Sequence, residues 1–296
     1  MTLAMTHNMR GRLLHNESMA RHCSWRAGGS ADIYYEPADK EDLSDFMQTI
    51  AADQPVTWVG LGSNLLVRDG GLRGVAIVVL QKLNRLQMLS SGRVYAEAGV
   101  TCARFARFCQ QQGLSGADFL AGIPGTIGGA LAMNAGAFGY ETWQFVANVE
   151  MMNRNGDLIE RQPEEFEVAY RSVKRAQDEW FSAASFELPQ RDEAQQSRIR
   201  ELLHKRNTTQ PIGLPSCGSV FKNPQGDHAA RLIEACGLKG SCIGEACVSE
   251  KHANFIINTG SARANDIEDL IEKVRHEVRQ QFSVELQHEV RILGDR

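Results

Sequence analysis

The segment from residue 121 to residue 139, AGIPGTIGGALAMNAGAFG, constrains the fold of this chain more than any other stretch. Six of its nineteen residues are glycine, five are alanine and none is charged. A surface loop would carry polar residues, and glycine inside a helix is less favourable than alanine by roughly 1 kcal/mol. Because glycine lets the backbone turn sharply and approach a partner closely, two interpretations follow. The segment is either a tight turn packed against a sheet, or a cradle for the phosphates and ring system of a large cofactor.

The cradle interpretation gives the backbone of this segment a specific task. The N–H groups of residues 125 to 129 are expected to point at pyrophosphate oxygens, an anion site that needs no cationic side chain. Pro124 stiffens the start of the segment because its ring fixes φ. A glycine cluster alone does not decide between cradle and turn.

A second glycine-rich stretch, GLGSNLLVRDGG at residues 60 to 71, favours the cradle. It follows the apolar run Val56–Val59 and supplies Ser63 and Asn64, whose side chains can bond backbone or phosphate. No Gly-Lys-Ser/Thr follows, and the third glycine and crossover helix of a Rossmann fingerprint are missing. Two phosphate-type loops about sixty residues apart therefore predict a dinucleotide held from both ends by a fold that is not a Rossmann fold.

Length and composition limit the other possibilities. The 296 residues, 43% of them hydrophobic, suffice for two domains, and a net charge of −4 gives no electrostatic case for nucleic acid. No apolar run approaches the roughly 20 residues of a membrane span. The seven cysteines are scattered without a CxxC pair, so we expect no metal site and buried, reduced thiols instead of disulfides. Residues 1–15 show no signal peptide and are predicted to be flexible.

Hydrophobic periodicity predicts alternating helices and strands. Helices are expected over residues 40–52, 101–112, 197–205 and 229–236, with a long one that starts at Asn265 and is capped through Glu268. Strands are expected over residues 56–59, 75–80, 93–100, 145–152, 158–161, 166–171, 181–188, 253–258 and 283–293. A domain boundary is predicted in the polar segment 189–196.

Three polar side chains are candidates for chemistry. Ser219, in CGSVF, could be a nucleophile, a proton donor or a turn hydroxyl, although the Gly-x-Ser-x-Gly pattern of a nucleophile elbow is absent. Arg171 could bind a carboxylate through two N–H groups or be a solvated surface charge. Glu289, on the polar face of the last strand, could be catalytic or an ordinary surface carboxylate. The Lys-Asn pair at 222–223 could bind an anion or a sugar, or only form a turn.

Seven motifs in order resemble those of the UDP-N-acetylenolpyruvoylglucosamine reductases, the MurB family of bacterial flavoenzymes. They are HCSWRAGGSAD, GLGSNLLVRDGG, AGIPGTIGGALAMNAGAFG, the pair Tyr170-Arg171, PSCGSVFKNP, VSEKHANFIIN and HEVRILG. The resemblance implies an α+β fold. It places a two-subdomain FAD-binding region of the vanillyl-alcohol-oxidase-like (PCMH-type) superfamily at 16–192, with subdomains of about 16–80 and 81–192. A C-terminal α+β substrate domain covers 197–296.

The resemblance also implies the reaction. FAD is bound non-covalently, NADPH is the co-substrate that reduces it, and UDP-N-acetylglucosamine enolpyruvate is reduced to UDP-N-acetylmuramate for peptidoglycan precursors. Arg171, Ser219 and Glu289 match the catalytic positions: Arg171 stabilises developing negative charge, Ser219 gives a proton, and Glu289 hydrogen-bonds the intermediate or orients its neighbours. The residues expected to contact substrate are Tyr170, Lys222 and Asn223. Those expected to bind the cofactor are Gly60, Gly62, Ser63, Asn64, Leu65, Gly122, Pro124, Gly125, Thr126, Gly128, Gly129, Asn134, Gly136 and Ala137.

The chain departs from the longer form of that family in two places. Only 47 residues separate Arg171 from Ser219, so the chain resembles the shorter second type, which lacks a loop carrying a substrate-binding tyrosine. Many relatives have a lysine that faces the substrate diphosphate, whereas residues 208–210 here read TTQ. One of three nearby cations is expected to replace it: Lys205, Arg206 or Lys222.

Two other functions stay open at this point. One is a flavin oxidase of the same superfamily that acts on another substrate, and the other is a catalytically silent flavin- or nucleotide-binding module. Under the main interpretation, we expect a cytoplasmic bacterial protein that is a monomer or a weak oligomer. Its partners are then the small molecules NADPH and the enolpyruvyl sugar nucleotide, with no nucleic acid and no membrane insertion.

Overall fold

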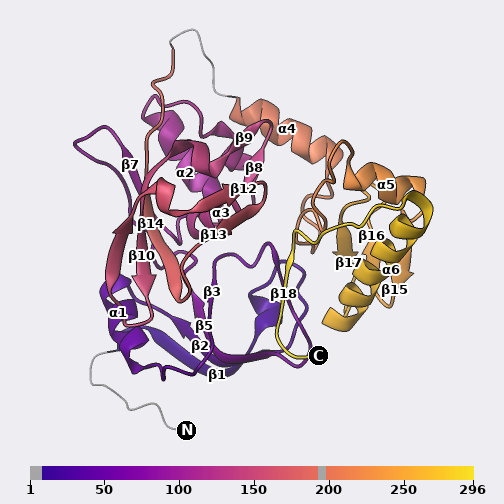
Figure 1. The fold of residues 1–296 in the computed structure, drawn as a ribbon, viewed down its shortest axis with the longest axis horizontal. Coiled ribbons are helices and arrows are strands. Elements are labelled where there is room, and N and C mark those ends of the chain that lie inside the picture. The colour runs from indigo at the N-terminus through magenta and orange to yellow at the C-terminus, as the bar shows by residue number, and fades with distance from the viewer. Residues whose placement is uncertain (1–8, 193–197) are drawn as a thin grey trace. The chain divides into compact units, whose positions relative to one another are not determined.

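The structure is a computed structural model that describes residues 9–192 and 198–296, shown as a ribbon in Figure 1. The chain divides into two compact units. The first contains Ile33–Leu61 and Gly74–His204 together with the N-terminal residues up to Leu14, and the second contains His15–Asp32, Gly62–Arg73 and Lys205–Arg296. No helix in the described ranges is long and apolar enough to cross a membrane.

The division into units departs from the predicted linear boundary near residue 192. Two N-terminal segments, which the sequence assigned to the FAD-binding region, belong to the same unit as the C-terminal part. The reason is packing: Trp25 and Leu66, both fully buried, lie in one hydrophobic core with Phe221 and Leu270.

Two sheets have most of their residues in the first unit. The first sheet has the order β1-β2-β5-β3. Its strands are β1 (Arg12–Ser18), β2 (Ser30–Glu36), β3 (Val56–Val59) and β5 (Leu72–Val78), and the helix α1 (Lys40–Thr49) follows β2 in the chain. Leu43 and Phe46 of α1 share a buried core with Val75 and Ile77 of β5, which confirms the amphipathic helix expected over 40–52.

The second sheet of this unit has the order β11-β10-β14-β7-β6. Its strands are β6 (Leu86–Met88), β7 (Val94–Glu97), β10 (Val146–Asn153), β11 (Leu158–Arg161) and β14 (Glu179–Phe186). The helix α2 (Cys102–Gln111) begins after Thr101, whose side chain accepts the Arg104 N–H as predicted for an N-cap. Phe105 of α2 packs in the core with Phe186 of β14.

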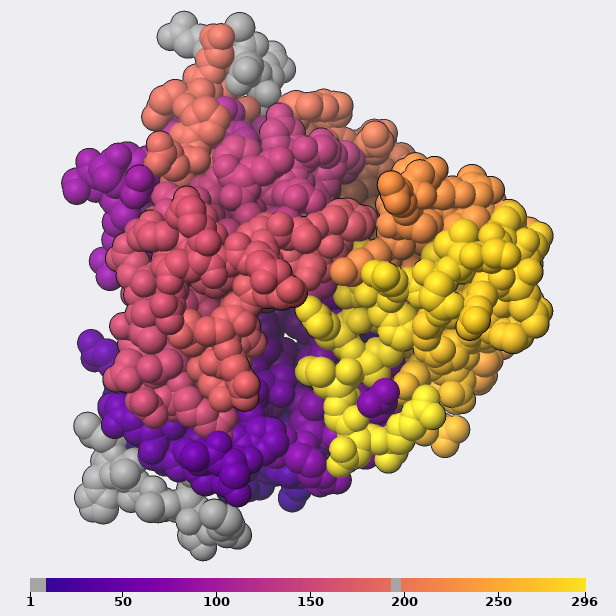
Figure 2. All heavy atoms as spheres, in the orientation of Figure 1, coloured from indigo at the N-terminus to yellow at the C-terminus, as the bar shows by residue number. Residues whose placement is uncertain are grey.

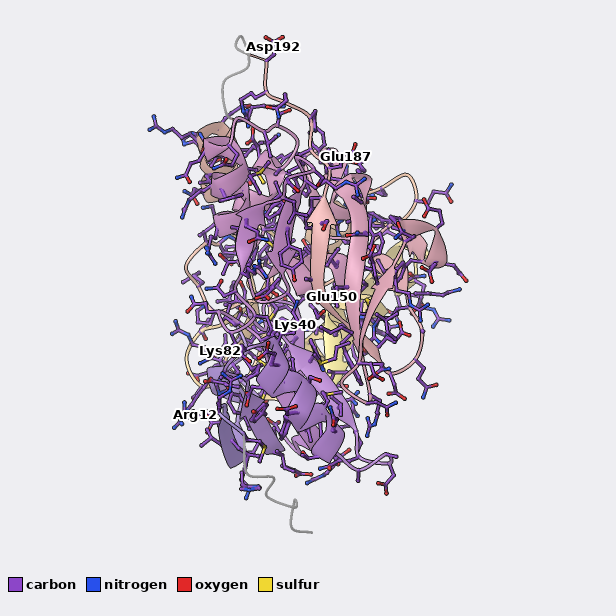
Figure 3. All side chains as sticks on the ribbon, turned by 90° about the vertical axis from the view of Figure 1, so that its left-hand side faces the viewer. Arg12, Lys40, Lys82, Glu150, Glu187 and Asp192 are labelled. Carbon is purple, nitrogen blue, oxygen red and sulfur yellow. A yellow bond between two sulfur atoms is a disulfide. The ribbon has the colours of Figure 1, made fainter. Side chains whose placement is uncertain are left out.

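An ion cluster connects α1 to the second sheet. The ammonium group of Lys40 donates to Glu150 Oε1 at 2.5 Å and to the Tyr95 hydroxyl at 2.7 Å. Figure 3 labels Lys40 and Glu150, which approach each other from α1 and β10. Because both charges are partly withdrawn from water, the pair fixes the orientation of the helix on the sheet more than it adds stability.

The second unit combines a small sheet with helices. Its sheet has the order β15-β16-β17, made of β15 (Cys242–Ile243), β16 (Ala246–Val248) and β17 (Ile256–Asn258). The helices α5 (Ala229–Ala235) and α6 (Ala264–Phe282) contribute to its core, and α4 (Ile199–Thr209) spans the sequence boundary between the units. The atoms of α6, in the gold to yellow part of the colour range, are visible on the face of this unit that Figure 2 shows. Two short strands, β4 (Leu65–Val67) and β18 (Arg291–Leu293), pair in parallel.

Three expectations about element ends are wrong. β1 begins at Arg12, inside the N-terminal segment predicted to be flexible, because Leu13 packs against the first core; residues 1–8 lie outside the described residues. The last strand covers only Arg291–Leu293 instead of 283–293. The helix α6 begins at Ala264, earlier than expected: the Asp266 carboxylate accepts the Arg263 N–H at 2.9 Å, and the Asp69 carboxylate accepts the N–H groups of residues 264 and 265, both at 3.0 Å.

The cysteine expectation is wrong for one pair. Cys242 and Cys247 lie directly opposite each other in the β15–β16 hairpin, with Cα atoms 4.1 Å apart, and form a disulfide. Their spacing becomes a bonding distance only when the hairpin forms, which the sequence does not show. The other five cysteines are free, and four of them are buried.

Candidate active site

The glycine-rich segment 121–139 is not a continuous loop in the first unit. It contains the helix α3 (Ile127–Met133), which follows a short 3-10 helix (Asp118–Gly122). Thr126 is the N-cap of α3, and its hydroxyl oxygen accepts the Gly129 N–H at 3.4 Å. The Thr126 side chain therefore has a structural role as the cap of this helix.

The backbone N–H groups of this segment are only partly available to a ligand. The Ile127 N–H donates to the carbonyl of Val100 at 2.8 Å, and the Gly128 N–H donates to that of Ala98 at 2.9 Å. The expectation that N–H groups 125 to 129 all point at phosphate is wrong for these two and for residue 129. In the described ranges the N–H groups of residues 125 and 126 donate no hydrogen bond, so they remain for an anion.

Glycines bring the two glycine-rich stretches together within this unit. A Cβ atom placed on Gly60 would lie 2.4 Å from the Thr126 hydroxyl oxygen, and one on Gly128 would lie 2.8 Å from the Ala98 Cβ. Since real Cβ atoms do not approach other atoms so closely, both positions require glycine for close packing. The start of the second glycine stretch thus lies directly against the N-terminus of α3.

Arg171 is attached to the far end of the same segment. The strands β12 (Glu167–Ala169) and β13 (Ser172–Lys174) form a hairpin whose turn is Tyr170-Arg171, so the expectation of a strand continuing to residue 171 is wrong. Arg171 has φ of +52°, which the tight turn demands. Its guanidinium donates to the carbonyl of Gly136 at 2.5 Å and to that of Asn134 at 3.3 Å.

The neighbours of Arg171 fix it further. The Tyr170 ring centroid lies 5.0 Å from its guanidinium carbon, and 45% of Tyr170 is exposed. Asn134, itself left-handed with φ of +43°, donates through its side chain to the carbonyl of Ala169 at 3.2 Å. Three of the predicted residues, Asn134, Gly136 and Arg171, are therefore one bonded group in the first unit, with Asn134 buried and the other two half-buried.

Ser219 and Glu289 lie on neighbouring segments of the second unit. The Glu289 N–H donates to the carbonyl of Val220 at 2.8 Å, and the Lys222 N–H donates to that of Gln287 at 2.9 Å. Phe221 and His288 form the antiparallel bridge between these two bonds. Both catalytic candidates are half-buried. Residues 70 positions apart in the chain therefore lie on two segments that are paired through their backbones.

The predicted cofactor residues 62–65 are bonded to both of these segments. The side-chain amide of Asn64 donates to the carbonyl of Glu289 at 3.0 Å, and the carbonyl of Asn64 accepts the Arg291 N–H at 2.9 Å. The thiol of Cys217, two residues before Ser219, donates to the carbonyl of Leu65 at 3.4 Å. Burial raises the pKa of the Cys217 thiol, so it stays protonated and acts as a hydrogen-bond donor instead of a nucleophile.

Two asparagines near Ser219 make structural hydrogen bonds: Asn223, which the sequence analysis named, and Asn254, which it did not. The side-chain oxygen of Asn223 accepts the Ala229 N–H at 3.1 Å and so supports the start of α5. Asn254, only 3% exposed, accepts the Phe221 N–H at 2.9 Å and donates to the carbonyl of Phe221 at 2.8 Å. A lone asparagine inside the apolar run ANFII was the available signal, because a buried amide needs partners.

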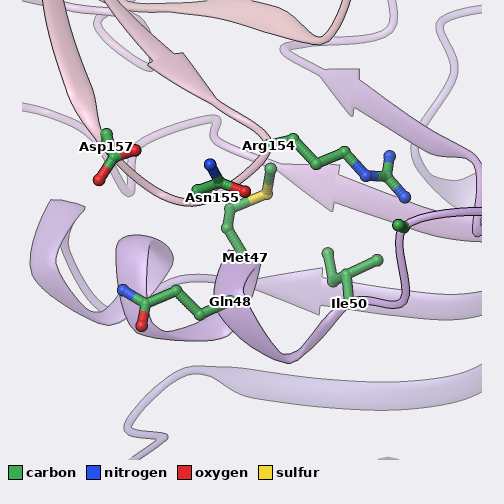
Figure 4. Close-up of a pocket in the computed structure, with 7 residues that line it drawn as sticks. Met47, Gln48, Ile50, Arg154, Asn155 and Asp157 are labelled. Atoms are coloured by element: carbon green, nitrogen blue, oxygen red, sulfur yellow. The ribbon is translucent and has the colours of Figure 1, made fainter.

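A separate hollow in the first unit is not the candidate site. It has a volume of about 390 Å³ and lies between the end of α1 and the β10–β11 turn, as Figure 4 shows. Its lining contains none of the predicted site residues: it consists of Met47, Gln48, Ile50, Ala52, Arg154, Asn155 and Asp157.

Comparisons with known proteins match two parts of the chain to known families. The model described as "FAD binding domain" matches residues 31–161, and the one described as "UDP-N-acetylenolpyruvoylglucosamine reductase, C-terminal domain" matches residues 210–293. A reductase of that name from Alkalilimnicola ehrlichii is 57% identical over 96% of both chains. The chain belongs to the UDP-N-acetylenolpyruvoylglucosamine reductase family.

Other relatives extend this result to the whole chain. The reductase of Methylococcus capsulatus is 54% identical, over 97% of this chain and 94% of the relative. The crystal structure of the reductase from Thermus caldophilus matches with a TM-score of 0.82 and 29% identity, over 97% of this chain and all of that chain. The α+β fold with an FAD-binding region and a C-terminal family domain is thereby confirmed. Neither a flavin oxidase on another substrate nor a silent binding module finds support among these relatives.

Proposed function

We propose that this chain reduces UDP-N-acetylenolpyruvoylglucosamine to UDP-N-acetylmuramate, with NADPH as the reductant and non-covalently bound FAD as the cofactor. The observation that carries the proposal is the bonded ladder in the second unit. Backbone bonds from Glu289 to Val220 and from Lys222 to Gln287 pair the two segments that carry Ser219 and Glu289. Bonds from Asn64 to Glu289 and from Cys217 to Leu65 connect these segments to the loop 62–65. A proton donor, a carboxylate and a phosphate-type loop are the groups that this reaction needs from the protein.

The described residues fit a flavin dinucleotide. Gly60 and Gly128 let their segments pack directly against Thr126 and Ala98, and the N–H groups of residues 125 and 126 remain for a phosphate. FAD would be held by residues of the two glycine-rich stretches: Gly60, Gly62, Ser63, Asn64, Leu65, Gly122, Pro124, Gly125, Thr126, Gly128, Gly129, Asn134, Gly136 and Ala137. When bound, FAD supplies the hydride that is added to the terminal vinyl carbon of the enolpyruvyl group.

Arg171 stabilises the negative charge that develops when the vinyl group is reduced. That charge spreads onto the carboxylate-bearing carbon and its carboxylate, and a guanidinium is permanently cationic and matches a carboxylate with paired donors. The carbonyls of Gly136 and Asn134 hold the guanidinium in place. A preorganised charge of this kind contributes several kcal/mol because it does not reorient during the reaction.

Ser219 gives the proton that completes the reaction. Its hydroxyl proton passes to the carbanion-like carbon next to the carboxylate, and the hydroxyl is then restored by a proton from solvent. A hydroxyl is a weak acid, but the acceptor is strongly basic, so placement matters more than acidity. Glu289, on the adjacent segment, orients the intermediate through a hydrogen bond.

The substrate diphosphate needs a cation in place of the lysine that residues 208–210 lack. Arg206 is half-buried, and burial lowers its pKa. Its guanidinium donates from Nε to the Gln210 side-chain oxygen at 2.8 Å, and no carboxylate among the described residues pairs with it. Arg206 therefore fits this role better than Lys205 or Lys222, and Tyr170, Lys222 and Asn223 complete the proposed substrate contacts.

The experiment separates the two half-reactions. Wild-type protein should oxidise NADPH faster when the enolpyruvyl sugar nucleotide is present; no stimulation would reject this substrate. Ser219→Ala should still reduce its flavin with NADPH but lose about 10²- to 10⁴-fold of turnover with substrate, the range for removal of an acid group. Ser216→Ala, three residues earlier in the same loop, is the matched control and should retain both. Equal loss of both half-reactions in Ser219→Ala would contradict the proton-donor role.

A cytoplasmic location and a monomeric or weakly oligomeric state are part of the same proposal. The proposed substrate is a soluble nucleotide made inside the cell, and the reductant NADPH is intracellular. Light scattering of the FAD-loaded protein tests the oligomeric state, and a tight dimer would contradict it.

A further inference from the structure

Every backbone polar group of the two residues after Ser219 is held by a hydrogen bond. The N–H of Val220 donates to the backbone carbonyl of Asn254 at 2.9 Å, and the carbonyl of Val220 accepts the Glu289 N–H at 2.8 Å. The N–H and carbonyl of Phe221 both bond the Asn254 side chain, at 2.9 and 2.8 Å. Asn254 thus bonds three of these four backbone groups, and the fourth, the carbonyl of Val220, also accepts the Val290 N–H at 3.4 Å.

The side chain of Asn254 makes the two hydrogen bonds to Phe221 that the backbone of a neighbouring strand would make. An amide has one acceptor and two donors in a fixed plane, which is the pattern that a neighbouring strand offers to a residue. Asn254 is 3% exposed, so water does not replace these bonds if the amide is removed. A buried polar pair of this kind holds one conformation because the alternatives leave polar groups without partners.

We propose that Asn254 is a positioning residue for Ser219 that acts through the backbone of Phe221 and Val220. The proposal rests on the proton-donor role of Ser219 given above and deepens it. Asn254 bonds the two residues after Ser219 and not the serine hydroxyl. It keeps the Ser219 segment in register with the Glu289 segment. Loss of the amide lets the Ser219 segment shift, and a shift of about 1 Å at a reacting group costs on the order of 100-fold in rate.

The chain offers a matched control for this residue. Asn258, at the end of β17, is also 3% exposed. Its side chain donates to the carbonyl of Trp25 at 2.8 Å and accepts the N–H groups of Gly260 and Ala262. Asn258 is therefore an equally buried asparagine of the same unit. Its side-chain bonds go to Trp25, Gly260 and Ala262 and not to residues 219–221, and its N–H donates to the carbonyl of Pro215 at 3.0 Å, a backbone bond that the substitution by alanine keeps.

The first test compares the half-reactions of Asn254→Ala and Asn258→Ala in FAD-loaded protein. Asn254→Ala should reduce its flavin with NADPH within about twofold of wild type, but its reoxidation by the enolpyruvyl sugar nucleotide should slow by about 10- to 100-fold. Asn258→Ala should not separate the two half-reactions. The proposal is overturned if Asn254→Ala loses both equally, keeps both, or behaves like Asn258→Ala.

The second test uses Asn254→Asp, which keeps the shape. A buried carboxyl next to the Phe221 carbonyl has a raised pKa because burial and the nearby oxygen disfavour its charge. The protonated carboxyl can accept the N–H and donate to the carbonyl, whereas the carboxylate can only accept. Reoxidation of the variant by substrate, relative to wild type, should therefore recover as the pH falls from 8 to 6. A constant ratio across this range would contradict the proposal.

A third measurement does not depend on activity. In hydrogen exchange of the full chain, the amide of Phe221 should exchange at least about tenfold faster in Asn254→Ala than in wild type, and unchanged in Asn258→Ala. If wild type itself fails to use the enolpyruvyl sugar nucleotide, the proposed reaction is wrong, and this measurement still decides whether Asn254 holds the Ser219 segment. Unchanged protection of Phe221 in Asn254→Ala overturns the positioning role by itself.

Discussion

A methyl group at residue 60 is expected to break the contact between the two glycine-rich stretches of the first unit. In Gly60→Ala the new Cβ atom would lie 2.4 Å from the hydroxyl oxygen of Thr126 and 3.4 Å from the Thr126 Cβ. The first distance is impossible, and the second is an ordinary contact. The Thr126 hydroxyl must therefore move, and with it the hydrogen bond that it accepts from the Gly129 N–H.

The magnitude follows from what the hydroxyl does. Loss of an N-cap side chain costs about 0.5 to 2 kcal/mol, and holding a threonine off its rotamer costs about 0.5 to 1.5 kcal/mol. Gly60→Ala should therefore lower the free energy of unfolding by about 1 to 3 kcal/mol. Thr126→Ala alone should cost about 1 kcal/mol, because it removes the cap without adding a clash.

A double-mutant cycle isolates the contact. In Gly60→Ala/Thr126→Ala the nearest atom to the new methyl group is the Cβ of residue 126, so the double variant should be about as stable as Thr126→Ala. The assay is urea unfolding of the four FAD-free proteins, with FAD affinity measured separately by quenching of flavin fluorescence. The steric explanation is refuted if the two substitutions are additive within about 0.5 kcal/mol, the scatter expected for independent sites.

Two further predictions concern the second unit. Hydrogen bonds from Arg68 lower the pKa of Glu268 below its usual 4.5, so its contribution to stability is fully present above about pH 4.5 and is lost as the pH falls through the lowered pKa. Glu268→Gln should thus show a smaller fall in Tm between pH 5 and pH 3 than wild type; an equal fall would contradict this assignment. Reduction of Cys242–Cys247, which are five residues apart, should lower the unfolding free energy by about 2 kcal/mol, the value for a short loop. Urea midpoints with and without reductant measure it, with Cys242→Ser as the control that should not respond, and equal wild-type midpoints would contradict it.

Much of the local structure was predictable from the sequence, because its causes lie within a few residues. The strand at Val56–Val59 was predicted with the ends that it has, since its apolar run is bounded by a proline and a glycine. Thr101 was recognised as a cap because its partner is three residues away. The order of the motifs indicated the family, which the relatives confirm. The glycines at residues 60 and 128 indicated close approach of the backbone to a partner, because the sequence itself shows that these residues have no Cβ atom.

The tertiary structure alone decided which polar groups are paired. The sequence offered the N–H groups of residues 127 and 128 to a phosphate, but carbonyls beyond β7 accept them. It offered Asn265 as the cap of α6, but the helix begins after Arg263. The carboxylate of Asp69, 196 residues before Asn265, accepts the N–H groups of residues 264 and 265. It gave no sign that Asn254 holds Phe221, 33 residues away. Propensity and periodicity report on neighbours along the chain, whereas a hydrogen bond depends on atoms within about 3 Å in space, and only folding brings those atoms together.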